Sequence, residues 1–397
     1  MSRYIIIGAG GVGVTLAAEL QRAGRDVLLV ARGAQLEFAR AGKLRYIRPD
    51  GDRLLDLPVV GGPDEVTLTG ADVLVLATKT QDAEAVIAEW AAQPVRPADG
   101  GSGHRPAAAC LPLVTTQNGL ETERIALRRF ASVLGGVLWV PASYVRPGEV
   151  ISPAAPAVAV LWLGVYPGGS HPRLAGIAAD LRAANVEVQV VPDILRWKAA
   201  KLTASVTFAL TALYPPGDLR DQAAALLKDE ARETLAAAGY GIADVATEVT
   251  ADLSRFSVLQ VPGRGREGNS TWQSLSRSGS LETDFLNGEV VLAARLAGRT
   301  APASQAIAER ARRAVRDGVA PGSLTEDDLR ATLPQLNGVL IDAASLHREL
   351  GRPSPPAILD VRWALGDPHG RAHYLNGHIP TAVYADLDTQ LLSLIHI

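Results

Sequence analysis

The side chains that could transfer a proton are unevenly distributed along this chain of 397 residues. Five of its seven histidines lie beyond residue 340, and only His104 and His171 fall in the first three hundred positions. Both lie in stretches rich in glycine and proline, which predict loops. An enzyme built from this large segment would therefore need a lysine or a carboxylate as its proton donor.

A glycine-rich segment near the start has the spacing of a dinucleotide-binding turn. Gly8, Gly10 and Gly13 form the pattern Gly-x-Gly-x-x-Gly, and Gly11 adds a fourth glycine inside it. In such a turn the first glycine allows a tight bend, the second lets backbone approach a pyrophosphate, and the third permits close helix–strand packing. The helix that follows offers free N–H groups to phosphate. The expected ligand is a dinucleotide.

The end of the next expected strand indicates which dinucleotide binds. A site selective for NAD places an Asp or Glu there, which holds the ribose hydroxyls. This chain has Arg32 in that place, and a guanidinium suits a 2′-phosphate. NADPH/NADP is therefore the predicted cofactor. The single cysteine, Cys110, excludes a cysteine-rich metal site, and no metal is predicted.

The elements that must position these residues alternate between strands and helices. Apolar, β-branched runs predict strands, and 3.6-residue patterns predict helices between the earlier ones, such as 14–20 and 81–90. The predicted strands are 4–7, 26–30, 73–77, 111–115, 133–140 and 186–191. This alternation predicts an α/β fold with a Rossmann-type parallel sheet. The segment 94–106 is expected to be an exposed loop.

The character of the chain changes after the last of these strands. Helical patterns dominate from residue 193 to about residue 319, which predicts a second, all-helical domain. A further break near residues 320–323 begins a third segment. The predicted division is 1–192, 193–322 and 323–397.

Composition and charge exclude several classes of protein. Apolar residues make up 47% and charged residues 20%, which is typical of a folded protein. The formal net charge of −3 gives no general attraction to nucleic acid or to an anionic membrane. No apolar run is long enough to span a bilayer, and the N-terminus does not resemble a signal peptide. We therefore expect a soluble, cytoplasmic protein.

Six separated motifs follow one another along the chain. They read GxGxxG, ATKTQ, QNGL, WKAAKL, STWQS and ETDFLNG, and they begin at positions 8, 77, 117, 197, 270 and 282. In this order they resemble the ketopantoate reductase (2-dehydropantoate 2-reductase) family, over about residues 3–320. The resemblance implies NADPH-dependent reduction of a 2-oxo acid, with ketopantoate reduced to pantoate on the route to pantothenate and coenzyme A.

The resemblance also implies a role for the polar residues of these motifs. Lys201 matches the general acid, which protonates the alkoxide that hydride transfer leaves, and burial can lower the pKa of such a lysine to roughly 7–8. Glu282 matches a glutamate near the acid and the substrate, and Ser270 matches the serine that binds the substrate carboxylate. Lys79 and Asn118 match residues of the cofactor and substrate cleft.

Two features of the helix that carries Lys201 leave alternatives open. Lys198 lies three residues earlier on the same helix face, so spacing alone does not separate the two lysines, although the motif favours Lys201. Many relatives carry asparagines four residues after the acid and three or four further on, where this chain has Ser205 and then Phe208 or Ala209. Ser205 is expected to contact the substrate, but a hydroxyl lacks an amide's paired donor and acceptor, so the pocket is expected to differ.

The last segment resembles a different family. The sequences AILDVRW at 357–363 and YLNGHIP at 374–380 are similar to the start of a rhodanese-type sulfurtransferase. The match covers about 65 residues and stops before an active-site loop, so we expect an incomplete fragment, from truncation or a reading-frame end. No cysteine follows Leu324, and sulfur transfer needs a thiolate.

Three alternatives stand beside ketopantoate reduction. The substrate could be another branched 2-oxo acid or carbonyl, the tail could make the chain a sulfurtransferase, and the glycine turn could serve a non-catalytic NADP-binding regulator. In the leading interpretation the partner is a small-molecule 2-oxo acid, with no nucleic acid and no membrane. A homodimer is the candidate assembly.

Overall fold

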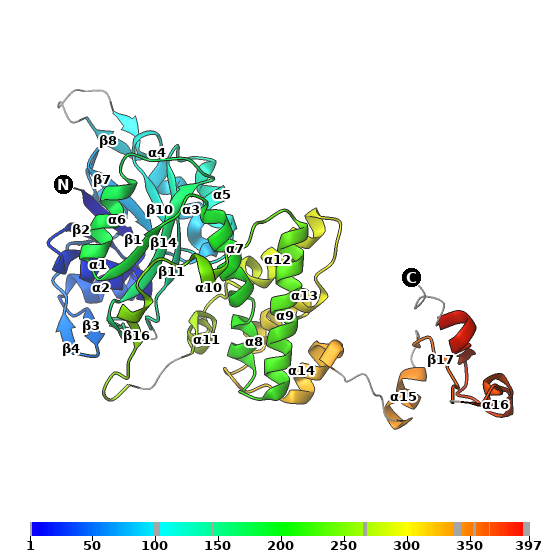
Figure 1. Ribbon diagram of the computed structural model, residues 1–397. Helices are drawn as coiled ribbons and strands as arrows, with labels where there is room; N and C mark the ends of the chain where they lie inside the picture. Colours follow the sequence, from blue (N-terminus) through cyan, green and yellow to red (C-terminus); the bar gives the residue numbers. More distant parts are fainter. Residues whose placement is uncertain are drawn as a thin grey trace. The chain divides into compact units, whose positions relative to one another are not determined.

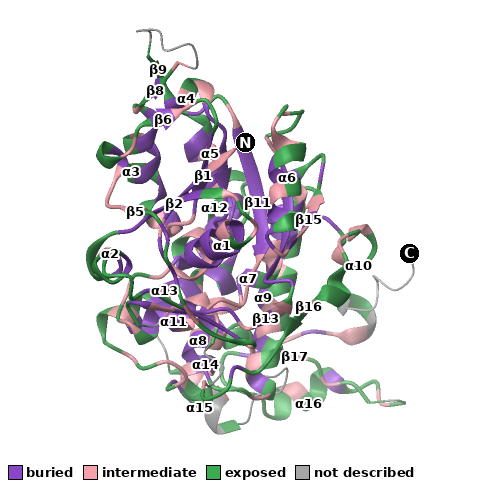
Figure 2. Ribbon diagram, turned by 90° about the vertical axis from the view of Figure 1, so that its left-hand side faces the viewer, coloured by how far each residue is buried: buried purple, intermediate pink, exposed green. Residues whose placement is uncertain are grey.

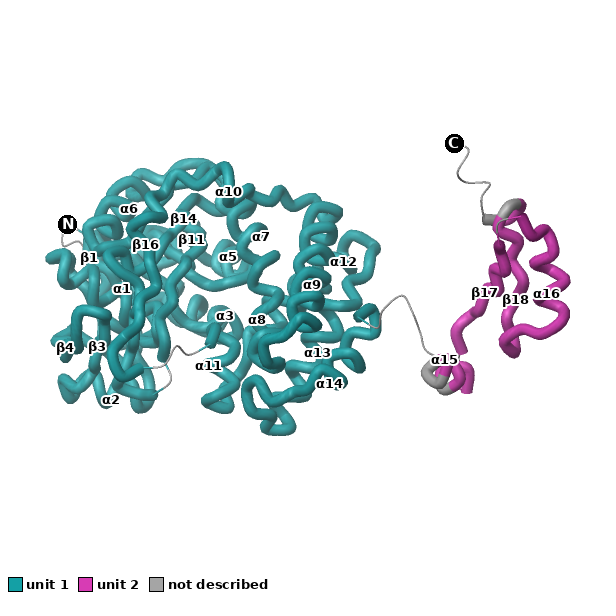
Figure 3. Tube along the Cα trace, turned by 60° about the horizontal axis from the view of Figure 1, so that its bottom comes forward, with its two compact units in different colours: residues 1–336 teal, residues 337–397 magenta. Residues whose placement is uncertain are grey.

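The computed structural model describes residues 2–97, 104–144, 146–264, 268–336, 343–351, 355–364 and 366–391. The chain divides into two compact units, residues 1–336 and residues 337–397 (Figure 3). Unit 1 contains the sheet and most of the helices, and unit 2 contains the tail. Among the described residues, no helix is both long enough and apolar enough to cross a membrane.

An eight-stranded sheet forms the N-terminal part of unit 1, with the strand order β15-β14-β11-β10-β7-β1-β2-β5 (Figure 1). The strands are β1 Arg3–Ile7, β2 Asp26–Val30, β5 Val59–Val60, β7 Asp72–Leu76, β10 Leu113–Thr115, β11 Val133–Trp139, β14 Ala159–Tyr166 and β15 Val186–Val190. All neighbours are parallel except β11 and β14, which pair antiparallel. The Rossmann-type sheet expected from the sequence is confirmed. The antiparallel strand β14 was not among the predicted strands.

Helices cover both faces of this sheet. One face packs against α1 (Gly11–Arg22) and α6 (Leu174–Ala183), and the other against α3 (Thr80–Ala91), α4 (Ala107–Cys110) and α5 (Glu121–Leu127). Strands buried on both faces are predominantly apolar, which explains the continuous run that follows Asp72 in β7. Figure 2 shows this as buried residues along the strands and on the inner sides of the helices.

Short strands lie beside the main sheet. They are β3 Arg45–Arg48, β4 Gly51–Leu54, β6 Leu68–Thr69, β8 Pro94–Arg96, β9 Arg105–Pro106, β12 Glu149–Ile151, β13 Ala154–Pro156 and β16 Phe256–Val258. β8 and β9 pair antiparallel at the two ends of the segment expected to be a loop, and residues 98–103 lie outside the described part. β16 follows the first helices of the second part and pairs with β13, so that part is helical apart from one short strand.

The second part of unit 1 is built from α7 Ile194–Ser205, α8 Phe208–Leu213, α9 Asp218–Ala237, α10 Val245–Glu248, α11 Ser270–Ser276, α12 Asn287–Leu296, α13 Pro302–Arg316 and α14 Glu326–Thr332. Asp193 begins α7, because its carboxylate accepts the N–H groups of Leu195 and Arg196. Buried residues of α9, α12 and α13 form the core of this part. Leu329 of α14 and Leu333 are also buried in that core, so this unit continues to Leu336.

Unit 2 contains α15 Ala343–Leu350, β17 Leu359–Asp360, α16 Gly370–Asn376 and β18 Val383–Tyr384. β17 and β18 pair parallel, with Leu359 opposite Val383. These two side chains are 60% and 62% exposed, so the apolar face of this small sheet is open to solvent within the described chain.

Candidate active site

The turn between β1 and α1 requires glycine at two positions. Gly8 has a φ of +117°, and a Cβ there would lie 2.8 Å from the carbonyl carbon of Ala77. A Cβ at Gly13 would lie 1.8 Å from the carbonyl oxygen of Gly8. At Gly10, by contrast, a Cβ would meet no described atom within 4 Å, so a ligand can approach the backbone there. This open backbone, at a helix start without a side-chain cap, fits a dinucleotide pyrophosphate.

Arg32 lies where the second strand ends and α2 (Gly33–Arg40) begins. The sequence showed no carboxylate at this strand end, but the fold brings Glu89 of α3 to it. Nη2 of Arg32 lies 2.5 Å from Oε2 of Glu89, and both side chains are largely exposed. A 2′-phosphate would therefore compete with Glu89 for the guanidinium.

Lys79 and Glu282 meet although they are 203 positions apart. Nζ of Lys79 donates to Oε2 of Glu282 at 2.8 Å, and Oε1 accepts from both the N–H and the hydroxyl of Thr80 at 3.0 Å. Burial opposes ionisation of Glu282, but the charge of Lys79 and these hydrogen bonds outweigh it and hold its pKa below the usual value. Glu282 therefore remains a carboxylate that ties α3 to the segment before α12.

Lys201 lies in the second half of α7, and this helix lies between the sheet and the other helices (Figure 1). Trp197, one turn earlier, stacks on Trp162 of β14 at 5.1 Å and fixes the helix on the sheet. Nζ of Lys201 donates to the carbonyl oxygen of Leu138 at the end of β11. The pKa of Lys201 is lowered from 10.5 to about 7, mainly by burial and also by the charge of Lys198, while the charge of Glu282 opposes the decrease. Near neutral pH this lysine can either donate or accept a proton.

Asn118 lies in the turn after β10, beside the Lys79–Glu282 pair. The hydroxyl of Thr80 lies 3.5 Å from its carbonyl oxygen. Gly119 follows with a φ of +79°, and a Cβ there would lie 2.3 Å from the carbonyl oxygen of Phe285, so the turn packs closely against the helical part.

Ser205 and Ser270 are the remaining candidates. Ser205 is the last residue of α7, and its buried hydroxyl has no hydrogen-bond partner among the described residues, which leaves it free for a bound ligand. Ser270 begins α11, after Asn269, which caps the helix by accepting the N–H of Trp272. Among the described residues, no hydrogen bond joins Ser270 to the other candidates.

The structure adds residues that the motifs alone did not single out. Thr80 holds Glu282, and Glu123 forms a buried ion pair with Lys198 at 2.8 Å. Lys198 also donates to the carbonyl oxygen of Gln117 at 2.9 Å. The sequence contained one indication of this cluster of charged residues. The chain has only five lysines, and three of them, Lys79, Lys198 and Lys201, belong to the candidate site or contact it.

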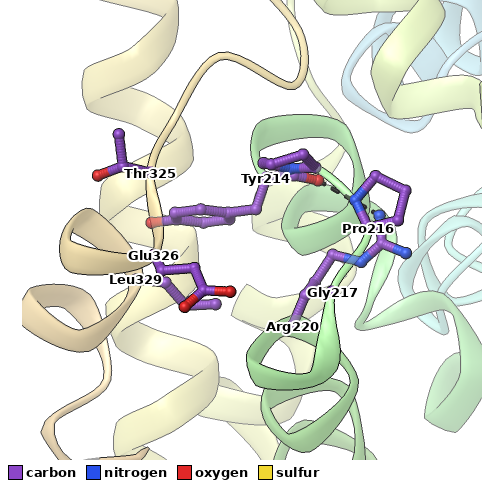
Figure 4. Close-up of a pocket in the computed structure, with 8 residues that line it drawn as sticks. Tyr214, Pro216, Gly217, Arg220, Thr325, Glu326 and Leu329 are labelled. Carbon is purple, nitrogen blue, oxygen red and sulfur yellow. Dashed lines mark hydrogen bonds between the residues drawn. The ribbon is translucent and has the colours of Figure 1, made fainter.

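A small pocket in the helical part lies apart from these residues (Figure 4). It is lined by Tyr214, Glu326 and Arg220, and Arg220 donates to the carbonyl oxygen of Tyr214 at 3.3 Å. It contains none of the candidate residues, and we assign it no role.

Comparison with known proteins identifies the family. The ketopantoate reductase PanE/ApbA family matches residues 4–165, and the C-terminal domain of the same family matches residues 193–314. The chain belongs to the ketopantoate reductase family. It is therefore an NAD(P)H-dependent oxidoreductase of the class that reduces 2-oxo acids.

Individual relatives agree with this assignment. The chain is 28% identical over 302 residues to 2-dehydropantoate 2-reductase from Archaeoglobus fulgidus, covering 73% of this chain and 90% of that protein. It shares its fold with a PanE/ApbA family ketopantoate reductase from Ralstonia eutropha, with a TM-score of 0.63, 23% identity and coverage of 80% and 99%. The fold is also that of a D-mandelate dehydrogenase solved with NADH and anilino(oxo)acetate, with a TM-score of 0.63, 16% identity and the same coverage.

The tail matches a different protein over a short segment. It is 49% identical over 53 residues to the putative thiosulfate sulfurtransferase SseB of Mycobacterium tuberculosis. This match covers 13% of the chain and 19% of that protein, so it confirms the resemblance in sequence and shows no rhodanese fold.

Proposed function

We propose that this protein reduces a 2-oxo acid with NADPH, and that 2-dehydropantoate (ketopantoate) is the substrate and pantoate the product. One observation carries the proposal: Lys201, whose pKa burial lowers to about 7, lies within electrostatic reach of the carboxylate of Glu282. A proton donor poised near neutral pH is what the reduction of a ketone needs. The named relatives and the family assignment support the choice of substrate.

Each residue of the site has its own role in the proposed reaction. When bound, the nicotinamide supplies the hydride that forms the new C–H bond as the carbonyl π bond breaks. Lys201 donates a proton to the carbonyl oxygen, so no free alkoxide has to form. Glu282 orients the substrate oxygen and Lys79, and Asn118 positions the reactants from the end of the neighbouring strand, β10. Ser270 donates to the substrate carboxylate.

The glycine turn and Arg32 bind the cofactor in this proposal. Gly8, Gly10, Gly11 and Gly13 form the pyrophosphate site at the start of α1, and Arg32 holds the 2′-phosphate, which favours NADPH over NADH. In the proposed division, residues 1–192 bind the cofactor, residues 193–322 supply the acid and the substrate contacts, and residues 323–397 take no part. The cytoplasmic location and the homodimer stay predictions.

A second candidate is the reduction of another 2-oxo acid. Ser205 stands where many relatives have an asparagine, and neither Phe208 nor Ala209 supplies the second amide. The likeness of fold to D-mandelate dehydrogenase is compatible with a different side chain on the substrate. In this case the roles of Lys201 and Glu282 stay the same.

The test is the oxidation of NADPH and NADH, followed at 340 nm, with a panel of 2-oxo acids. We expect kcat/KM for ketopantoate to exceed that for 2-oxoisovalerate, pyruvate and phenylglyoxylate by at least about tenfold, since a well-fitted hydroxyl contact discriminates by that much or more. A preference for phenylglyoxylate would select the second candidate. Absence of turnover with every member, in protein that binds NADPH, would refute both and favour a non-catalytic regulator.

A further inference from the structure

A buried ion pair lies beneath the proposed active site and has no role in the reaction derived so far. Nζ of Lys198 in α7 lies 2.8 Å from Oε1 of Glu123 in α5, and the two side chains are 2% and 0% exposed. The hydroxyl of Thr115 donates to the same carboxylate oxygen at 2.5 Å. Burying two charges costs desolvation energy that an apolar pair of similar volume would not cost, so stability alone is a weak reason for this pair.

The position of the pair connects it to two groups of the site. Lys198 also donates to the carbonyl oxygen of Gln117 at 2.9 Å, and that carbonyl belongs to the peptide bond that enters Asn118. Lys198 is one helical turn before Lys201, on the same face of α7, and its charge acts on Lys201.

We propose that Lys198 is a positioning residue of this site: paired with Glu123, it fixes the peptide between Gln117 and Asn118 and places a positive charge one turn from Lys201. The inference rests on the proposed function, which assigns Lys201 as the acid. Lys198 itself is buried and acts through its neighbours, so it does not touch the substrate.

The sign of the electrostatic effect follows from the charges around Lys201. On its own helix Lys198 is positive and lowers the pKa of Lys201, and from the segment before α12 Glu282 is negative and raises it. Lys79, from the segment after β7, pairs with Glu282 and partly neutralises it. Glu123 of α5 pairs with Lys198 in the same way. Removing Lys198 together with its counter-charge should therefore raise the pKa of Lys201.

The test compares the full-length double variant Lys198→Met/Glu123→Gln with the full-length wild-type protein. Both charges are removed together, because methionine alone would leave a buried carboxylate without a partner. The pKa of Lys201 is measured by NMR of the ε-carbons in protein labelled with 13C-lysine, where the five lysines keep the spectrum simple and Lys201→Arg assigns the signal. We expect an increase of up to about one pKa unit, because the loss of Glu123 offsets part of the effect of losing Lys198. Lys228→Met, which removes an exposed lysine of α9, is the matched control and should cause no shift.

Kinetics provide the second readout. The pH at which kcat/KM for the 2-oxo acid begins to fall should increase by the same amount in the double variant, and KM should rise several-fold because Asn118 is held less firmly. A folded double variant whose Lys201 pKa stays within about 0.3 units of the wild-type value overturns the inference. If the double variant does not fold, the variant Lys198→Arg is used instead. In this variant the pKa of Lys201 should stay low, and a return of that pKa to the ordinary lysine range overturns the inference. A shift seen by NMR in a protein without turnover would refute the proposed function while supporting the coupling of the two lysines.

Discussion

Substitution of Lys201 by methionine tests the centre of the proposed mechanism. Methionine keeps most of the volume and the apolar stem, but it cannot donate a proton to the substrate or to the carbonyl oxygen of Leu138. General acid catalysis contributes about 10²–10⁴ in rate, which is about 3–5 kcal/mol of activation free energy. We expect kcat to fall by that factor, with the Kd of NADPH within about twofold of the wild-type value.

The pH dependence of the wild type follows from the same residue. Reduction needs the protonated form of Lys201, and with a pKa of about 7 half of the molecules carry the proton at pH 7. At pH 9 about 1% would carry it, so kcat/KM should fall roughly fiftyfold between these two values. In the oxidative direction the neutral amine is required, and the rate should instead rise through the same pKa.

The assay is the initial rate of NADPH oxidation from pH 5.5 to 9.5 with the best 2-oxo acid of the panel, for the wild type and Lys201→Met. Exogenous methylamine should partly restore the activity of Lys201→Ala, since it can occupy the vacated space and donate a proton. A flat profile above pH 7, or a loss of less than about tenfold in Lys201→Met, would refute the assignment of Lys201 as the acid.

Four further outcomes are expected. Arg32→Ala should raise KM for NADPH by about tenfold or more and leave KM for NADH nearly unchanged, because a charge-assisted hydrogen bond to phosphate contributes about 1.5–3 kcal/mol; equal effects on both cofactors would contradict the assignment. Glu282→Gln removes the group that raises the pKa of Lys201, so the decline of kcat/KM should begin at lower pH, opposite to the shift expected for the Lys198 double variant. A chain that ends at Leu336 should keep its reductase activity, and neither it nor the full chain should transfer sulfur from thiosulfate to cyanide. A chain that ends at Ser323 should instead melt at least about 5 °C lower, because it loses buried leucines of the helical core; equal melting temperatures would show that this segment contributes nothing.

The strands of the sheet illustrate what local patterns can predict. The apolar run of β7 and the glycine turn after β1 were recognisable because the hydrophobic pattern and the backbone requirement are local properties. No strand was predicted over residues 159–166, where β14 lies, although this run is apolar; its antiparallel direction depends on the path of the intervening chain. β16 was missed because it is three residues long and is formed only through its pairing with β13.

The two lysines of α7 show the same limit at the active site. Their spacing places both on one face, and only the packing separates them: Lys198 is buried against Glu123, whereas Lys201 reaches the end of β11. For this reason Lys198→Ala is not a neutral control for substitutions of Lys201, because it would leave the buried carboxylate of Glu123 unpaired.

The sequence by itself determined the family and the glycine turn, and its motifs predicted Lys201 as the acid, because these depend on residue types at fixed short spacing. Only the tertiary structure decided which charges face one another. Glu282 meets Lys79 across 203 positions, and Glu89 meets Arg32 across 57. The low pKa of Lys201 likewise arises from burial and from the charge of Lys198, against the opposing charge of Glu282. Coulomb interactions and desolvation depend on distance and burial in space, and neither can be obtained from the order of the residues along the chain.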